Sequence, residues 1–492
     1  DVISTLTVTS TTDTADGDTS SIEALNADKG ADGVVSLREA ILAANNTTGT
    51  DTITFNIGLS DAGHVYYQDN AAAGFTAPVQ TTLADGSITD FDADYPAGHE
   101  RSWWRLAPVT PLPGISDTLI IDATTQAGYA NRPIIEIDGS SAPFTDGLYF
   151  GLSTTGSEVH GLVINNFGDD GIEAIASGYT FTGNYIGTDV SGTVDAGNGD
   201  VGLQVAGDSQ IGGTVAGEGN VIAGNDGTGL RLGGDGHTVE GNLIGVAADG
   251  SSPLGNLGHG IRITLGDNIT IGGTSAGAPN TIANNALDGI LVENAASDGV
   301  AILGNAIYSQ GELGIDLVGG TEDASGVTAN DTGDADTGAN NLQNYPLLTS
   351  AVTDGSTTVT IDGSINTTAS TMYRIEFFSS TVADASAHGE AERHLGAITV
   401  TTDGSGNASF SQAISTTVAV GEFLTATATV DLGGGNFGDT SEFAQNIAST
   451  APNTAPSITS NGGGATAAVN VAENATAVTT VTATDADLPA QT

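Results

Sequence analysis

Six glycine-led apolar phrases recur between residues 171 and 317: GIEAI (171–175), GLQV (202–205), GLRL (229–232), GIRI (260–263), GILV (289–292) and GIDL (314–317). Their starts lie 31, 27, 31, 29 and 25 residues apart. A longer repeat of 60 residues overlies this spacing, because IGGT at Ile211 returns at Ile271 and GNVIAGN at Gly219 returns as PNTIANN at Pro279. Repeats of this length are typical of solenoids, in which one unit buries its apolar face only when a neighbour stacks on it.

The residues within each phrase indicate which solenoid this is. Apolar and outward positions alternate, as in a β-strand, and the Gly, Asn and Asp between phrases leave no room for helices. We therefore predict an all-β fold built on a right-handed parallel β-helix; a β-propeller would need four strands per repeat and more aromatic residues. An Asn tolerates left-handed backbone and can bond to the next turn. The asparagines expected at the coil corners are Asn184, Asn220, Asn225, Asn242, Asn284 and Asn305.

The charge of the chain indicates which kinds of partner it can bind. Nine Lys and Arg against 59 Asp and Glu give a net charge of −50 over 492 residues. Such a surface repels nucleic acid and anionic membranes, and it favours multivalent counter-ions such as calcium. With no cysteine and no apolar run of 18 residues, we expect an extracellular bacterial protein at the cell surface, without direct membrane insertion. The alternative is that the charge serves only solubility at high salt.

Residues 1–60 are predicted to cover the N-terminal end of the β-helix. Ser36-Leu37-Arg38-Glu39 has the pattern of a capping box and opens a helix that ends at Asn45-Asn46. Ile53, Phe55 and Ile57 then alternate as a strand. A helix before the first coil is what a solenoid needs over its open apolar end.

The helix carries a family resemblance. VSLREAILAAN (Val35–Asn45) resembles the CSLREA-type N-terminal module that precedes secreted bacterial β-helices, with Val35 in place of the cysteine of that family. DTLIIDATTQAGY from Asp117 and GNYIGTDVSGT from Gly183 resemble the repeats of the same proteins. The resemblance covers most of residues 30–448 and implies a β-helix, which we place at residues 116–320, but it implies little about function.

Residues 61–115 interrupt the repeat and contain Trp103 and Trp104. Paired aromatic residues can stack on sugar rings, so both are candidate glycan-binding residues. The alternative is that they pack a long insertion against the first coils.

Residues 321–345 form an acidic, glycine-rich linker. Asp331, Asp334, Asp336 and Asn341 place hard oxygen ligands on one short loop, a pattern suited to calcium. We expect a bound ion here to restrict hinge motion between two rigid domains. The alternative is a flexible acidic spacer.

The C-terminal third has a different pattern of alternating apolar and polar residues. Residues 346–448 contain TTVTIDGSI, MYRIEFFSS and FLTATATVDL, which predict an immunoglobulin-like antiparallel sandwich. Residues 449–492 contain AVNVAENATAVTTVTATDADL, which resembles the start of a cadherin-like repeat. The resemblance implies that Glu473, Asp485 and Asp487 are calcium ligands. The segment is too short for a whole repeat, so either a longer chain or a neighbouring molecule would complete it.

Stacking of the six phrases predicts one outward row on a single sheet. Many β-helix enzymes act on polysaccharides from such a row, and Arg231 and Arg262 are candidate ligands for an acidic polysaccharide. The row contains no lysine and no paired carboxylates, so we predict that it is not catalytic. Its members are Glu173, Gln204, Arg231, Arg262, Leu291 and Asp316.

The sequence therefore predicts an extracellular structural or adhesive protein, a calcium-stiffened component of a fibre, sheath or large adhesin. We expect it to associate with copies of itself, because the β-helix end near Leu317 and the partial repeat both need cover. The alternatives are a carbohydrate-active β-helix enzyme on acidic polysaccharide and a non-catalytic glycan-binding module.

Overall fold

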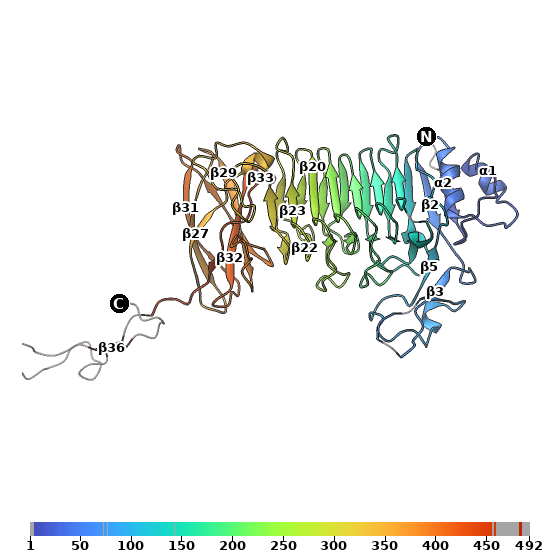
Figure 1. Ribbon diagram of the computed structural model, residues 1–492, viewed down its shortest axis with the longest axis horizontal. Helices are drawn as coiled ribbons and strands as arrows, with labels where there is room; N and C mark the ends of the chain where they lie inside the picture. Colours follow the sequence, from blue (N-terminus) through green and yellow to red (C-terminus); the bar gives the residue numbers. More distant parts are fainter. Residues whose placement is uncertain are drawn as a thin grey trace, which may run out of the picture.

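The computed structural model describes residues 4–71, 73–75, 77–142, 144–454, 457–458 and 482–484, and most of these residues form one elongated rod (Figure 1). The N-terminal helices lie at one end of the rod and an antiparallel sandwich lies at the other. Three sheets run between them, parallel except within the insertion of residues 61–115, as predicted for a right-handed parallel β-helix. Within the described part of the chain, no helix has the length and apolar character needed to cross a bilayer.

Each full coil contributes one strand to each of the three sheets, so the β-helix has three faces. The nine-stranded sheet consists of β1 (Ser4–Val8), β2 (Asp51–Phe55), β6 (Leu119–Asp122), β9 (Glu158–His160), β12 (Tyr179–Thr182), β15 (Ser209–Gly212), β18 (Thr238–Glu240), β21 (Thr270–Gly272) and β24 (Ala301–Leu303). The ten-stranded sheet consists of β25 (Ala306–Tyr308), β22 (Thr281–Ala283), β19 (Leu243–Ile244), β16 (Val221–Ile222), β13 (Tyr185–Ile186), β10 (Leu162–Asn165), β7 (Ile135–Asp138), β5 (Ser102–Leu106), β3 (His64–Tyr66) and β4 (Val79–Gln80). The seven-stranded sheet consists of β26 (Ile315–Leu317), β23 (Ile290–Val292), β20 (Ile261–Leu265), β17 (Leu230–Gly233), β14 (Leu203–Val205), β11 (Ile172–Ala174) and β8 (Leu148–Phe150).

The interior of the β-helix is built from columns of apolar side chains in register. On the seven-stranded sheet, Leu203 pairs with Leu230, and Leu230 with Ile261. All three side chains are fully buried, so each coil covers the apolar face of the one before it. Each added coil therefore buries more apolar surface, and every Å² of that surface stabilises the fold by roughly 25 cal/mol.

Two ladders of buried asparagines run along the coil corners. In the first, each amide nitrogen donates to the amide oxygen of the next coil over Asn184, Asn220, Asn242, Asn280 and Asn305. In the second, the same bonds join Asn198, Asn225, Asn256 and Asn285, and Asn285 donates to Gln310. The corner prediction is therefore confirmed for five of the six asparagines and wrong for Asn284. Its neighbour Asn285 takes the ladder position, because Asn284 has a left-handed φ of 62° and bonds to the carbonyl of Gly245 instead.

The N-terminal module forms the cap that the sequence predicts. Besides α1 (Ile22–Ala27), it contains α2 (Leu37–Asn45), whose Ser36 and Glu39 form the capping box. The β-helix begins earlier than the predicted residue 116, however. β1 already pairs in parallel with β2, and β2 with β6, so residues before 60 build the first two strands of the nine-stranded sheet.

The C-terminal domain is a two-sheet antiparallel sandwich. One sheet consists of β27 (Leu347–Thr353), β28 (Val359–Asn366) and β31 (Asn407–Ile414). The other consists of β30 (Arg393–Thr401), β29 (Met372–Ser380), β32 (Phe423–Gly433), β33 (Asn436–Thr440) and β34 (Ile447–Ala448). Beyond it, β35 (Ser457–Ile458) pairs with β36 (Ala483–Thr484), and the remainder of the expected cadherin-like segment lies outside the described residues. The short 3-10 turns are η1 (Asp85–Ser87), η2 (Ala123–Thr125), η3 (Gly139–Ser141) and η4 (Ala339–Leu342).

The sandwich closes the last coil of the β-helix. Phe378 and Phe443, both 3% exposed, pack into the apolar core of the β-helix rather than that of the sandwich. Side chains of the sandwich also accept hydrogen bonds from backbone N–H groups of the last coil. These bonds join Gly299 to Asp439 (2.6 Å), Ile302 to Thr440 (2.9 Å), Gly304 to Glu376 (2.8 Å), Gln310 to Glu390 (2.7 Å) and Leu317 to Glu442 (3.1 Å).

The acidic linker belongs to the same junction. Asn340 is buried, accepts from the N–H of Val300 and donates to the carbonyl of Thr440, so it ties the last coil to the sandwich. These bonds join the last coil to the sandwich directly, so residues 321–345 are not the sole connection between the two domains.

Candidate functional site

The predicted outward row exists with the predicted register. The strand pairings align Glu173 with Gln204, Gln204 with Arg231, and Arg231 with Arg262. Leu291 and Asp316 continue the row toward the sandwich, and Tyr149 precedes Glu173 at its other end. The row was predictable because six phrases of equal pattern can stack in only one parallel register without exposing their apolar positions.

In the first half of the row, side-chain hydrogen bonds connect three successive residues. Arg231 donates from Nη1 to Oε1 of Gln204 (2.7 Å), and Gln204 donates to Oε1 of Glu173 (2.8 Å). The buried Nε of Arg231 has no acceptor within the described structure. Gln204 therefore uses both its amide oxygen and its amide nitrogen within the row, whereas Arg231 donates there from Nη1.

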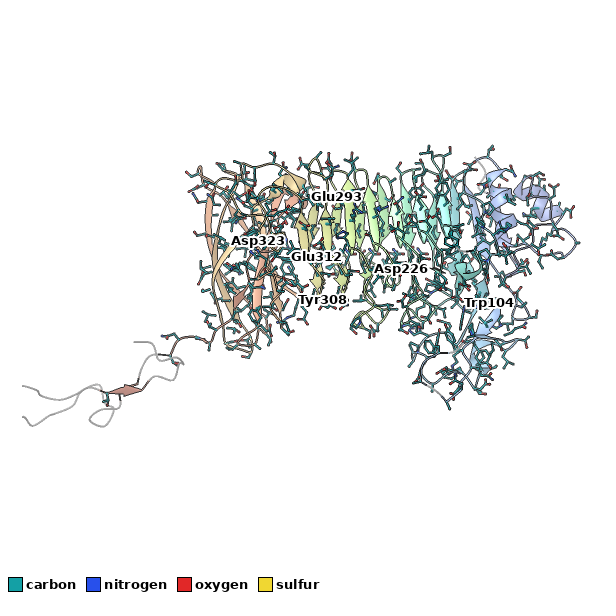
Figure 2. All side chains as sticks on the ribbon, in the orientation of Figure 1. Trp104, Asp226, Glu293, Tyr308, Glu312 and Asp323 are labelled. Atoms are coloured by element: carbon teal, nitrogen blue, oxygen red, sulfur yellow. The ribbon has the colours of Figure 1, made fainter. Side chains whose placement is uncertain are left out.

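The second half of the row pairs its arginine with a carboxylate. Arg262 donates from Nε (3.1 Å) and Nη2 (2.7 Å) to the two oxygens of Glu293, which lies on the outer surface of the coils (Figure 2). The hydrogen bond from Arg262 and its charge hold the pKa of Glu293 below its usual value. This bidentate pair occupies the guanidinium fork that would otherwise bind a uronate.

The last coils hold an acidic group with an unusual pKa. Burial, followed by repulsion from Asp288 and Glu322, raises the pKa of Asp316 to about 7. His259 approaches Asp288 to 3.1 Å without hydrogen-bond alignment. A carboxyl with a pKa near neutrality can serve as a general acid or base, but the row offers Asp316 no second carboxylate in register, since Leu291 is its partner.

The two tryptophans do not form an exposed sugar-binding platform. Trp103 and Trp104 are 1% and 5% exposed and lie in β5, which pairs in parallel with β7 where the insertion meets the coils (Figure 2). The indole of Trp103 donates to Glu136 (2.7 Å), and the ring of Trp104 stacks on His64 at 4.7 Å. The prediction that both rings stack on a ligand is therefore wrong. Both rings instead pack the insertion against the first coils, which was the alternative.

The acidic loop brings its three aspartates together. One carboxylate oxygen each of Asp331, Asp334 and Asp336 lies within 4.8 Å of the others, as calcium ligation would require. Burial and its two acidic neighbours raise the pKa of Asp334 to about 6, and Oδ1 of Asp336 is buried without a partner.

The fourth predicted ligand has other partners. The amide of Asn341 donates to Asp298 (2.8 Å) and to Asp439 (2.9 Å) at the junction with the sandwich. The cause is local, since Asn340 and Asn341 both adopt left-handed backbone in η4 and turn the chain away. The asparagine that contacts the loop is Asn344, whose N–H donates to Asp334 (2.8 Å) and whose Oδ1 accepts from the N–H of Asp331 (3.1 Å). Glu473, Asp485 and Asp487, the ligands expected from the cadherin-like resemblance, lie outside the described residues.

Comparisons with known proteins add little to this geometry. No family model and no curated protein matches the chain. Among solved structures, it is similar to the enzymatically active domain of bacteriophage CBA120 tailspike protein 2, with 14% identity and a TM-score of 0.13 over 81% of this chain and 67% of that one. It is also similar to the full-length tailspike protein 2 from an Escherichia coli O157:H7 bacteriophage, with 13% identity and a TM-score of 0.13 over 81% of this chain and 60% of that one. The chain thus spans three fifths of the full-length tailspike, and likenesses this distant carry no functional argument.

Proposed function

We propose that this protein is an extracellular structural or adhesive rod of a bacterial cell surface. The observation that carries the proposal is the closure of both ends of the β-helix by the chain itself, α2 at one end and the sandwich at the other. A solenoid closed in this way is a stiff spacer whose length grows with the number of coils. The outward row supports the same reading, because its arginines are engaged with Gln204 and Glu293.

Calcium is the proposed counter-ion, bound by Asp331, Asp334 and Asp336. Three carboxylates that repel one another become favourable neighbours when a divalent cation lies between them. Because Asn344 contacts both Asp331 and Asp334, a bound ion would also fasten the loop to the start of the sandwich.

The test of the rod is small-angle X-ray scattering at 0.15 M salt. The proposal expects one elongated particle whose maximum dimension does not change with calcium or chelator, because the junction is already fixed by hydrogen bonds. Two independently moving bodies in the scattering profile would contradict it.

Self-association remains part of the proposal, but not through the end at Leu317, which the sandwich covers. The other predicted route, strand addition at the cadherin-like segment, lies mostly outside the described residues. Analytical ultracentrifugation in calcium separates the cases: concentration-dependent polymers support assembly, and a monomer at every concentration removes it.

The second candidate function is activity on an acidic polysaccharide. The specific observations in its favour are the unpaired Nε of Arg231 and the raised pKa of Asp316 in one row. It is the weaker candidate because the two residues are separated by Arg262 and Leu291.

A further inference from the structure

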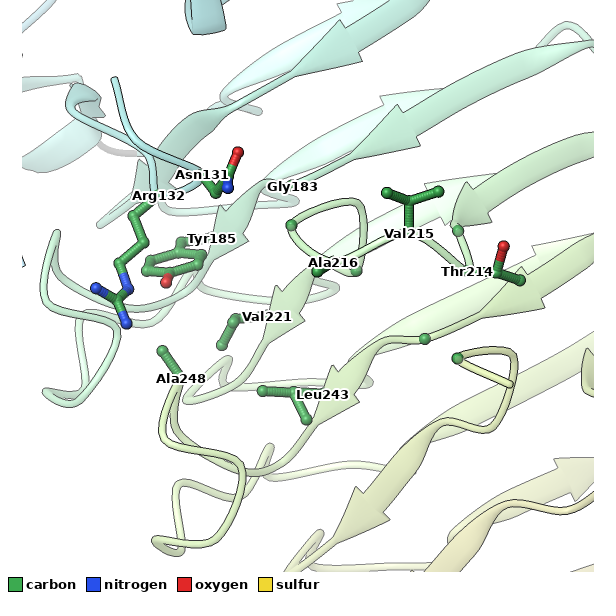
Figure 3. Close-up of a pocket in the computed structure, with 15 residues that line it drawn as sticks. Asn131, Arg132, Gly183, Tyr185, Thr214, Val215, Ala216, Val221, Leu243 and Ala248 are labelled. Carbon is green, nitrogen blue, oxygen red and sulfur yellow. The ribbon is translucent and has the colours of Figure 1, made fainter. Parts of the chain in front are cut away.

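A cavity of about 450 Å³ opens at the coil corner between the nine-stranded and ten-stranded sheets. Asn131, Arg132 and Tyr185 lie at one end of this cavity, and Thr214 and Val215 lie at the other (Figure 3). Its volume falls within the range of small-molecule sites. The cavity is separate from the outward row and from the acidic loop, since none of their residues lines it.

The floor of the cavity is made of backbone. Gly183, Gly217, Gly241 and Gly277 line it, and all four have left-handed φ values, between 65° and 92°. They lie on four successive coils, next to the first asparagine ladder. Coils stack at about 4.8 Å, so this floor extends roughly 14 Å along the rod. A Cβ at Gly241 would clash with the carbonyl of Gly213, which keeps the floor free of side chains. The shape fits a short oligosaccharide better than a single ring.

Arg132 supplies a positive charge at one end of this floor. Five of the arginines, Arg38, Arg105, Arg262, Arg374 and Arg393, form ion pairs with carboxylates within 4.0 Å. Arg132 has no such partner among the described residues and donates instead to the carbonyl of Gly98. In a chain of net charge −50, an arginine without a carboxylate at a cavity retains capacity for an external anion.

Tyr185, Glu100 and His99 are ionisable groups whose pKa values are affected by Arg132. Burial raises the pKa of Tyr185 to about 12, while the charge of Arg132 and a hydrogen bond from it act in the opposite direction. Burial raises the pKa of Glu100 and the charge of Arg132 opposes this rise, and no ion pair within 4.0 Å joins the two side chains. The guanidinium is thus held at the mouth of the cavity by Gly98 and Tyr185 and is not neutralised there.

We propose that this cavity binds an acidic oligosaccharide, with a carboxylate or sulfate group on Arg132 and the sugar chain along the glycine floor. Val215, which is 63% exposed, forms an apolar lip against which the C–H face of a sugar ring packs. This site goes beyond the proposed rod and does not depend on calcium or on self-association.

The experiment is isothermal titration calorimetry of the full chain at 0.15 M salt with three probes of equal length. The probes are a galacturonate trisaccharide, a sulfated galactose trisaccharide and a neutral galactose trisaccharide. We expect at least one acidic probe to bind, and the neutral probe to bind at least tenfold more weakly. Whichever acid binds identifies the source of the anion.

Arg132→Gln is expected to weaken acidic binding at least tenfold, and the matched control Arg393→Gln, with the same change of charge on the sandwich, is expected to leave it unchanged. Val215→Asp adds a negative charge at an exposed position and should weaken binding without disturbing the fold, which melting curves would verify. The proposal is overturned if no acidic probe binds at millimolar concentration, if the neutral probe binds equally, or if Arg132→Gln has no more effect than Arg393→Gln.

Discussion

The carboxylate of Glu442 accepts a hydrogen bond from the backbone N–H of Leu317, the last residue of β26 (3.1 Å), and a second from the N–H of Thr328 (2.9 Å). An open row of N–H groups at the end of a parallel sheet would be a template for association with another chain. Here the acceptors come from the sandwich, from Glu376 and Glu390 as well as Glu442. The sandwich is therefore a cap for the β-helix and not an independent module on a tether.

The junction predicts an unusual dependence of stability on pH. Burial raises the pKa of Glu442 to about 8 and that of Asp439 to about 6, against the opposing effect of their backbone hydrogen bonds. In the unfolded chain these groups titrate near 4. Between pH 4 and 8 the folded state thus binds more protons, so the free energy of unfolding falls as the pH rises through this window.

Chemical denaturation at constant salt, from pH 5 to pH 8.5, measures this dependence. Glu442→Gln, which stays neutral throughout, should flatten the curve, whereas Glu312→Gln on the exposed surface should not. A stability that rises toward pH 8.5 in the unaltered protein would contradict the account.

The asparagine ladders predict a costly substitution in the middle of the rod. Asn242→Ala removes the oxygen that accepts from both the N–H (3.0 Å) and the amide (2.9 Å) of Asn220, in a fully buried setting. Each buried donor left without a partner costs about 1–3 kcal/mol, so we expect a loss of roughly 2–5 kcal/mol in the free energy of unfolding. Asn436→Ala, at an exposed hairpin position, is the control and should cost less than about 1 kcal/mol. Equal effects of the two substitutions would show that the ladder does not stabilise the coils.

Local periodicity accounts for the parts of the fold that the sequence predicted. The capping box at Ser36–Glu39 and the register from Glu173 to Asp316 both follow from residues close in sequence or repeated at a regular interval. The second ladder was missed except for Asn225, although Asn198 and Asn256 each follow a glycine as Asn225 does. A search for asparagines at the same interval as the phrases would have found it.

Contacts between distant segments account for the parts that were missed. Nothing in the sequence around Glu376, Glu390 or Glu442 indicates that each accepts from the β-helix, 72, 80 and 125 residues away. The same holds for Trp103 and Trp104, whose burial depends on the return of the insertion into the ten-stranded sheet at β5. The cavity at Arg132 combines residues of four coils and of the preceding loop, so no single motif marks it.

The acidic loop predicts calcium binding that weakens in acid. Burial and its acidic neighbours raise the pKa of Asp334 to about 6, and calcium must displace that proton. Calorimetric titration should therefore show higher affinity at pH 7.5 than at pH 5, with proton release at the lower pH. Asp334→Asn should lower the affinity at least tenfold, and Asp384→Asn, outside the loop, should leave it unchanged. Affinity that is independent of both pH and Asp334 would exclude this site.

The outward row predicts the absence of uronan cleavage. Because Arg262 is paired with Glu293 and the raised-pKa carboxyl of Asp316 faces Leu291 in the register, the row holds no complete acid–base pair. Incubation with pectin and alginate should release neither unsaturated products nor reducing ends. Cleavage that disappears in Arg231→Ala or Arg262→Ala would establish the enzyme instead.

Hydrogen exchange of the backbone amides in the last coil of the full chain shows whether the sandwich caps the β-helix. If Glu376, Glu390 and Glu442 accept from Gly304, Gln310 and Leu317 as the structure describes, peptides over residues 299–318 will be protected to within about tenfold of peptides over residues 238–265 in the middle of the rod. Glu442→Ala should release the amides of Leu317 and Thr328 alone. Exchange of the whole last coil at the rate of an exposed sheet edge, in the unaltered protein, would contradict the account.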